Sequence, residues 1–317
     1  MYRNVMVPVD GSSFSREAVL QGLRLASYYG ATLHLVKVAR TPMPPTVPVS
    51  VAINPAAAGD ANARDLASLY ALAAECRANS NVVVKASLEN GPIVDCLVSY
   101  AHRARVDLIV MRTHARRGLA RVWFGSVTDG LIRDSAIPVL VVRPPSVNTA
   151  LNKGVGMMRV LVPLDGSALA EQALEPALAL ARADGGSITL LRIVTAWKEP
   201  QPGILASTLG PASAVEVSEA QRYLDSVLSW PDVGSIPVKR RVVISSDPAT
   251  AILQMSDDIE ADVIALATRG YGAIKRAAAG SVSDQVMRTS GVSVLVVHPT
   301  LEIWRTENAG APGFATA

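Results

Sequence analysis

The sequence predicts an α/β protein made of two tandem, doubly wound domains, each a five-stranded, mainly parallel sheet with helices on both faces. Short segments rich in Val, Ile and Leu alternate with amphipathic segments, as expected for buried parallel strands joined by crossover helices. The chain also repeats itself, because Asp10-Gly11-Ser12 returns as Asp165-Gly166-Ser167, and Gly125-Ser126 as Gly280-Ser281, both 155 positions later. A period this long indicates a duplicated domain, since solenoid repeats span only about 20–50 residues.

Apolar periodicity and turn residues predict nine alternating elements in the first half. The predicted strands are residues 4–9, 32–38, 81–87, 107–111 and 138–142, and the predicted helices are residues 13–29, 62–79, 93–103 and 126–134. A Pro-rich segment from Pro42 to Pro48 follows the second strand, and proline there is compatible with neither a helix nor a central strand. Alternating strands and helices require crossover connections, which place consecutive strands parallel in one sheet.

The same order of elements recurs in the second half. The predicted strands are residues 159–164, 187–194, 238–244, 262–266 and 292–297, and the predicted helices are residues 168–183, 216–229, 248–257 and 281–289. We therefore expect one domain over residues 1–144, a linker over 145–158, a second domain over 159–300 and a C-terminal tail over 301–317. Each domain is long enough to bury its own core.

Composition excludes several classes of protein. Half of the 317 residues are hydrophobic, yet no apolar run approaches the roughly 20 residues of a membrane-spanning helix. A net charge of +3 gives no broad basic surface for nucleic acid. Cys76 and Cys96 have no metal-ligand spacing and fall on apolar helix faces, which favours buried thiols. Because the first residues lead directly from Met1 into the first predicted strand, we expect no signal peptide. We expect a cytoplasmic protein with reduced thiols.

The candidate site follows from the rule that open α/β sheets bind ligands at the carboxyl ends of their strands, where the strand order reverses. Asp10 and Asp165 end the first strand of each half, and the loops 112–118 and 267–272 follow the fourth. If first and fourth strands are neighbours, each pair faces one crevice. The aspartate can then accept a hydrogen bond from a ribose hydroxyl or an amine. The alternative is that it only turns the chain into the following helix.

The Gly-Ser pair before the last helix of each half is a second candidate. Backbone N–H groups at a helix N-terminus, with a glycine that lets a ligand approach, can bind phosphate. The alternative is a capping box, because Ser126 and Ser281 are each followed three residues later by an acid, Asp129 and Asp284. Such an acid would repel phosphate unless it turned back toward its own cap.

With these motifs the sequence resembles the tandem two-domain members of the universal stress protein family. Nucleotide-binding members carry Gly, two residues, Gly, nine residues, Gly, then Ser or Thr. The second half reads Ala267-Thr-Arg-Gly270, nine residues and Gly280-Ser281, and the first half reads Arg112-Thr-His-Ala115, nine residues and Gly125-Ser126. The opening Val-Pro-hydrophobic-Asp-Gly-Ser also fits that family.

The resemblance implies a Rossmann-like fold and a stress-response protein that binds ATP or another adenine nucleotide, with or without Mg²⁺. By resemblance, an aspartate and the backbone of a valine contact the adenosine, and the glycine-rich loop holds the phosphates. The binding residues implied are, in the second half, Asp165, Val194, Ala267, Arg269, Gly270, Gly280, Ser281, Val282 and Ser283, and, in the first, Asp10, Val38, Arg112, Gly125, Ser126, Val127 and Thr128.

Both halves depart from the family pattern at its first glycine. Ala267 adds one methyl group, whereas Arg112 either fills the crevice or reaches a phosphate as a cation. Ala115 replaces a further glycine, which costs about 1–2 kcal/mol if that position needs a positive φ. We therefore expect the second half to bind nucleotide better than the first.

Three functions compete on these observations. The first is a nucleotide-binding regulatory protein, the second a slow ATPase, and the third an interaction scaffold that binds no nucleotide. We find no Walker-type loop, no Mg²⁺-binding carboxylate pair and no catalytic residue, and His114 has Arg269 as its counterpart. The closing strands 138–143 and 293–298 are expected to pair the two halves of the chain with each other, because exposed sheet edges tend to be paired or covered. Further association of chains into a homodimer or larger homo-oligomer is also expected, and His298 is expected at the solvated end of its strand.

Overall fold

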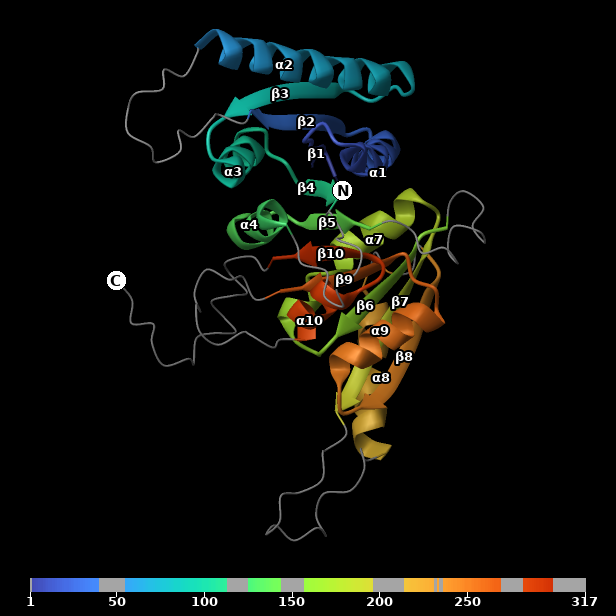
Figure 1. Cartoon of the computed structure of the whole chain (residues 1–317). Coiled ribbons are helices and arrows are strands. Elements are labelled where there is room, and N and C mark those ends of the chain that lie inside the picture. Colours follow the sequence, from blue (N-terminus) through green and yellow to red (C-terminus); the bar gives the residue numbers. More distant parts are fainter. Residues whose placement is uncertain are drawn as a thin grey trace, which may run out of the picture. The chain divides into compact units, whose positions relative to one another are not determined.

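The computed structural model describes residues 2–39, 55–112, 125–143, 157–195, 214–230, 233, 236–268 and 282–298 (Figure 1). The secondary structure falls into two compact units. The first contains the elements between Asn4 and Val142, and the second contains those between Arg159 and Val297. No helix in these described ranges is long and apolar enough to cross a membrane.

The first unit is a parallel sheet with the strand order β3-β2-β1-β4-β5. Its strands are β1 (Asn4–Pro8), β2 (Thr32–Ala39), β3 (Val84–Asn90), β4 (Leu108–Arg112) and β5 (Val139–Val142). Its helices are α1 (Ser13–Tyr29), α2 (Pro55–Ala78), α3 (Ile93–Arg103) and α4 (Ser126–Asp134). Helix α1 packs on β1 and β4, α2 on β2 and β3, and α3 on β2, β3 and α4 (Figure 1). The sheet is doubly wound, and its order reverses between β1 and β4.

The second unit repeats this topology with the strand order β8-β7-β6-β9-β10. Its strands are β6 (Arg159–Leu164), β7 (Ser187–Thr195), β8 (Val238–Ser245), β9 (Val263–Ala267) and β10 (Ser293–Val297). Its helices are α6 (Ala168–Glu171), α7 (Leu174–Ala183), α8 (Ala214–Leu228), α9 (Pro248–Asp258) and α10 (Val282–Thr289). The predicted fold class is confirmed.

Three predicted elements differ from the structure. The single helix predicted over 168–183 is wrong, because the chain leaves the helix after Glu171 and α7 begins at Leu174. Pro176 explains the break, since its ring conflicts with the carbonyl four residues earlier and it has no N–H to donate. Helix α2 begins at Pro55, earlier than predicted, because proline is favourable in a first helical turn. Strand β3 begins at Val84, later than predicted. The Pro-rich segment 42–48 lies outside the described residues.

The predicted solvated position of His298 is also wrong. Strand β10 is buried from Val294 to Val297, and the residue that follows it continues the buried run, with His298 only 9% exposed. Burial lowers the pKa of His298 to about 4, so the imidazole is neutral near pH 7.

A second buried histidine lies at the amino end of the first sheet. His34 is 2% exposed, with its Nδ1 2.9 Å from the Tyr100 hydroxyl and its Nε2 3.2 Å from the Asn4 side-chain oxygen. Burial, and then the charge of Lys85, lower the pKa of His34 to about 4. The group therefore joins β1, β2 and α3 as a neutral, hydrogen-bonded imidazole.

Candidate functional site

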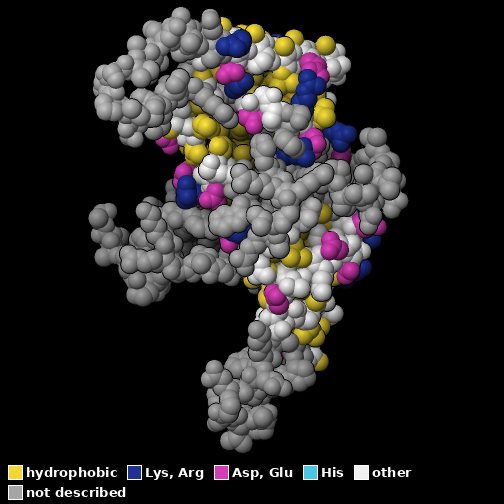
Figure 2. Space-filling view, in the orientation of Figure 1, with side chains coloured by type: hydrophobic (Ala, Val, Ile, Leu, Met, Phe, Trp, Pro, Cys, Tyr) yellow, Lys and Arg dark blue, Asp and Glu magenta, His cyan; other side chains and the backbone are white. Residues whose placement is uncertain are grey.

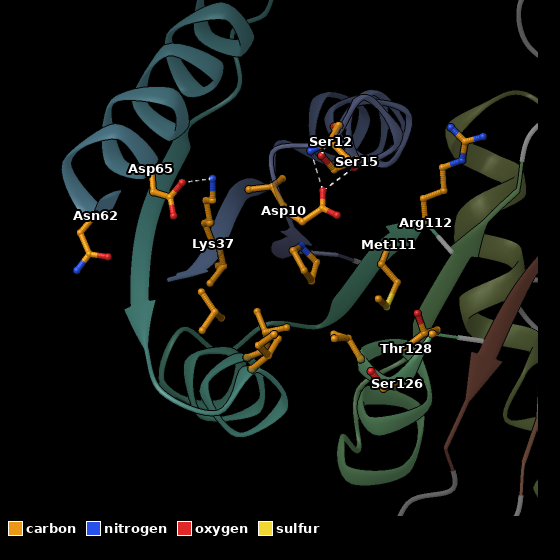
Figure 3. A pocket seen from close by; sticks show the side chains of 18 residues that line it. Asp10, Ser12, Ser15, Lys37, Asn62, Asp65, Met111, Arg112, Ser126 and Thr128 are labelled. Carbon is orange, nitrogen blue, oxygen red and sulfur yellow. Dashed lines mark hydrogen bonds and ion pairs between the residues drawn. The ribbon is translucent and has the colours of Figure 1, made fainter. Parts of the chain in front are cut away.

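A cavity of about 680 Å³ opens in the first unit at the carboxyl ends of β1, β2 and β4 and at the start of α4 (Figure 3). Strands β1 and β4 are neighbours, with Val5 paired to Leu108 and Met6 to Ile109, as the site prediction required. The cavity therefore lies where the strand order reverses. It brings together every residue that the resemblance implied for the first half, namely Asp10, Val38, Arg112, Gly125, Ser126, Val127 and Thr128.

Asp10 forms a tight turn into α1. Its Oδ1 accepts hydrogen bonds from the backbone N–H and the hydroxyl of Ser12, at 2.9 and 2.6 Å. In the second unit, Asp165 accepts the same two bonds from Ser167 at 2.9 and 2.6 Å. The turn interpretation is thus correct for both aspartates. Both bonds end on Oδ1, and a turn role does not exclude ligand binding.

The N-terminus of α4 is built from Gly125 and Ser126 without a capping side chain. Gly125 is the N-cap residue, and no side chain caps the helix. Ser126 is the first helical residue, and Asp129 lies 3.8 Å from Arg133, one turn along α4, rather than at the cap. The capping-box alternative is therefore wrong for the first unit. The backbone N–H groups of the first turn border the cavity and are a suitable site for an anion.

Neither a positive φ nor packing against the described residues requires glycine at position 125. Its φ is −60°, which any residue adopts, and a Cβ built there would meet no atom of the described residues within 4 Å. Gly130, in the same helix, contrasts with it, because a Cβ there would lie 2.6 Å from a methyl carbon of Val94. The missing side chain at Gly125 therefore leaves room in the cavity and does not serve packing against the described residues.

Arg112 lines the cavity, but its guanidinium forms an ion pair with a residue of α1. Its guanidinium lies 2.5 Å from the Glu17 carboxylate on α1, and the side chain is 9% exposed. Figure 3 shows the guanidinium extending away from Ser126 and Thr128. The guanidinium therefore does not fill the crevice in this structure, and the alternative that Arg112 contacts a phosphate as a cation stays a prediction. The ion pair turns it toward α1 because a carboxylate there offers a close partner.

Sequence reasoning missed Lys37 on β2 and the part of the cavity wall that α2 forms. Lys37 points into the cavity, and its Nζ lies 2.7 Å from Oδ1 of Asp65 on α2 (Figure 3). Asn62, one turn earlier on α2, also lines the wall. Apolar side chains complete the cavity, among them Val36, Ile93, Leu97 and Met111. In Figure 2 hydrophobic side chains of the first unit are visible beside basic and acidic ones.

In the second unit the described members of the predicted site occupy the equivalent places. Asp165, Val194 and Ala267 lie at the carboxyl ends of β6, β7 and β9, and Val282 and Ser283 begin α10. The Ser283 hydroxyl donates a hydrogen bond of 3.3 Å to the Ala267 carbonyl, which ties β9 to α10. Asp284 forms an ion pair of 2.9 Å with Arg288, so this acid also turns along its helix. The predicted residues outside the described ranges are Arg269, Gly270, Gly280 and Ser281, together with His114 and Ala115.

Neither a metal cluster nor an activated thiol is found in the part of the chain that the structure describes. No group of three or more His, Cys, Asp or Glu side chains there could hold a metal ion. Cys76 and Cys96 are free thiols, and burial raises the pKa of both. Their thiolate fraction at neutral pH is therefore lowered.

Fold and site together define a duplicated, doubly wound α/β protein with a cavity at the switch point of its sheet. The chain belongs to the universal stress protein family, whose sequence model matches residues 1–143 and 157–298. Universal stress protein Rv2005c of Mycobacterium tuberculosis is 29% identical over 303 residues, which cover 93% of this chain and 96% of the relative. Universal stress protein MJ0531 of Methanocaldococcus jannaschii is 27% identical over 155 residues, 46% of this chain and 84% of the relative.

A solved structure shows the same fold over nearly the whole chain. The crystal structure of a universal stress protein from Archaeoglobus fulgidus superimposes with a TM-score of 0.67, at 21% identity, over 93% of this chain and 98% of its own. At this identity the likeness establishes the fold and leaves the ligand to be argued from the site.

Proposed function

We propose that this protein binds an adenine nucleotide, ATP in the first place, and acts as a regulatory protein of the stress response. The observation that carries the proposal is the convergence of the seven first-half residues on one cavity at the switch point. They come from four separate parts of the chain, and their common location is what a nucleotide site requires.

The chemistry of the cavity supports a nucleotide. Its volume of about 680 Å³ falls within the range of roughly 300–1,000 Å³ typical of small-molecule sites. One part is lined by Val36, Ile93 and Leu97, which suit a flat base, and another by the start of α4, which suits phosphate. The open space at Gly125 lets a phosphate approach the backbone closely. Together these residues fit the group that the family resemblance implies.

We also propose that the two units bind nucleotide unequally, the second more tightly. Arg112 replaces a glycine of the family pattern in the first unit, whereas Ala267 adds only a methyl group in the second. Asp165→Ala is then expected to lower ATP affinity more than Asp10→Ala, in titrations of the full chain. Equal losses from the two variants would contradict the asymmetry and leave nucleotide binding itself in place.

Isothermal titration with ATP tests the proposal on protein freed of nucleotide by unfolding and refolding. Binding with a micromolar or lower dissociation constant supports it, and absorbance near 260 nm of the protein as purified gives an independent check. Absence of binding in both measurements would favour the scaffold. Phosphate release over hours separates a slow ATPase from a protein that only binds. Sedimentation with and without ATP tests the proposed homo-oligomer.

A further inference from the structure

A basic side chain occupies the same place in both units, beside the Asp-Gly-Ser turn. Lys37 and Arg192 lie 155 positions apart, the period of the duplication, near the carboxyl ends of β2 and β7. In the second sheet Arg192 pairs in register with Leu164, the residue before Asp165. In the first sheet Pro8 pairs with Val36, which places Lys37 at the corresponding position. Both cations therefore start from the strand next to the aspartate.

Each cation occupies the space beside the glycine of the turn. Gly11 and Gly166 have φ values of +83° and +86°, so the turn requires glycine for its backbone alone. A Cβ at Gly11 would lie 3.2 Å from Nζ of Lys37, and one at Gly166 would lie 3.5–3.6 Å from the guanidinium of Arg192. Arg192 also donates a hydrogen bond of 3.3 Å to the Leu164 carbonyl. The positive charge is thus packed against the backbone that carries the aspartate.

The helix that follows the strand holds each cation in this position, by a different contact in each unit. In the first unit, Lys37 forms an ion pair with Asp65 on α2, with 2.7 Å between Nζ and Oδ1, and the Lys37 side chain is 11% exposed. In the second, the Arg192 guanidinium lies over the ring of Tyr223 on α8, 5.6 Å from its centroid. The Tyr223 hydroxyl in turn donates a hydrogen bond of 2.9 Å to Glu171. The partner of the cation differs between the two units, but the cation lies beside the turn in both. The feature that the two units share is therefore the position of the cation.

The charges beside the Asp-Gly-Ser turn favour one part of a nucleotide over the others at this end of the cavity. Asp10 and Asp65 bring two negative charges and Lys37 one positive charge to the lining. This surplus of carboxylate repels phosphate, which the start of α4 favours at the other end. An aspartate and an ammonium side by side offer one acceptor and one donor, and an ammonium has three donors, of which Asp65 takes one. A vicinal diol matches such a pair, because one hydroxyl donates to the carboxylate while the other accepts from the cation.

We infer that Lys37 and Arg192 are specificity-determining residues that, together with Asp10 and Asp165, select a ribose with both hydroxyls over a deoxyribose. The inference rests on the proposed function, since it concerns the sugar of the nucleotide bound there. It assigns to the cation a contact with the sugar in addition to its contact with the turn. The ligand class it names is adenosine nucleotides with unmodified 2′ and 3′ hydroxyls.

Titrations with ATP and 2′-deoxy-ATP test this inference. The wild-type chain is expected to bind ATP about tenfold or more tightly than 2′-deoxy-ATP, as for loss of a hydrogen bond to a charged group. In the double variant Lys37→Met/Arg192→Met the two ligands are expected to bind within about twofold of each other. Lys37→Arg/Arg192→Lys exchanges the two cations and should keep the preference. Lys85→Met removes an exposed strand lysine outside the cavity and is the matched control.

Each outcome decides between the inference and the proposed function. Failure of the wild-type chain to bind ATP would reject the function, and the inference with it. ATP binding without a ribose preference, or with a preference that survives in the double methionine variant, would reject the inference alone. Thermal unfolding shows whether the methionine variant is folded, and if it is not, Lys37→Gln/Arg192→Gln gives the same comparison. Adenosine 2′,5′-bisphosphate should bind more weakly than AMP, and tighter binding would overturn the assignment.

Discussion

Replacing Gly125 by alanine tests whether ligand binding or folding requires glycine at this position. The backbone of Gly125, with φ −60° and ψ 155°, suits alanine, and the added Cβ would meet no atom within 4 Å in the part of the chain that the structure describes. Alanine lowers the entropy of the unfolded chain, which stabilises by about 0.4–1 kcal/mol, whereas alanine is a poorer N-cap than glycine by a similar amount. The free energy of unfolding is therefore expected to change by less than about 1 kcal/mol.

The affinity for ATP should respond much more strongly. A methyl group at this position occupies the space through which a phosphate would approach the first turn of α4. Loss of one hydrogen bond between a backbone N–H and a charged phosphate costs about 1.5–3 kcal/mol, which corresponds to roughly 10–150-fold in the dissociation constant. Adenosine has no phosphate, so its affinity should stay the same. Titration of Gly125→Ala in an Asp165→Ala background confines the measurement to the first unit.

Gly130→Ala is the matched control in the same helix. Its Cβ would lie 2.6 Å from a Val94 methyl carbon, an overlap that costs about 1–3 kcal/mol of stability. This variant should unfold at a lower temperature, yet bind ATP normally while folded. Unchanged ATP affinity in Gly125→Ala, or an equal loss for adenosine, would refute the assignment of the α4 N-terminus to phosphate.

Two further predictions concern charges. Burial lowers the pKa of His34 to about 4 in the folded protein, so between about pH 6.5 and 4 the unfolded chain binds a proton on this histidine and the folded chain does not. The free energy of unfolding should therefore fall by on the order of 3 kcal/mol from pH 6.5 to pH 4. Denaturant unfolding of His34→Gln should show a weaker loss over that interval, and the exposed His102→Gln should behave as the wild type does. Glu17→Gln removes the carboxylate that holds Arg112 and should raise ATP affinity severalfold at low salt without changing that of adenosine. A gain that persists at high salt, or that extends to adenosine, would contradict this explanation.

Local patterns were sufficient to locate the cavity but not to complete its walls. Asp10 and Gly125 stand at the ends of predicted elements, and the rule for open α/β sheets brings those ends together once β1 and β4 are neighbours. Asp65 could not be found in this way, because its contact with Lys37 depends on how α2 lies across the sheet. Lys37 did leave a signal, since a charged residue in an apolar strand recurs as Arg192 one period later.

The orientation of Arg112 shows a second limit of sequence reasoning. Its position beside the cavity followed from the family pattern, but the direction of its side chain depends on which carboxylate lies within reach. Helix α1 presents Glu17 at that distance, and no periodicity or motif encodes this pairing. The break between α6 and α7 was readable from Pro176 alone, since proline conflicts with a continuous helix, and the longer periodic pattern masked it.

Among the described residues, the two sites share the aspartate turn and the cation beside it, and they differ in the partner of that cation and at the end of the fourth strand. The aspartate turn is the same in both, down to its hydrogen bonds, and a cation lies against its glycine in each. At the end of the fourth strand, the second unit has Ala267 and Gln172 where the first has Arg112 and Glu17, so the second unit lacks both partners of this ion pair. Because the two units differ by one positive and one negative charge, their local net charge is the same. They differ in whether a cation lies beside the position where a phosphate would bind. The two units should therefore agree in their preference for the sugar and differ in how much each gains from successive phosphates, from AMP to ATP.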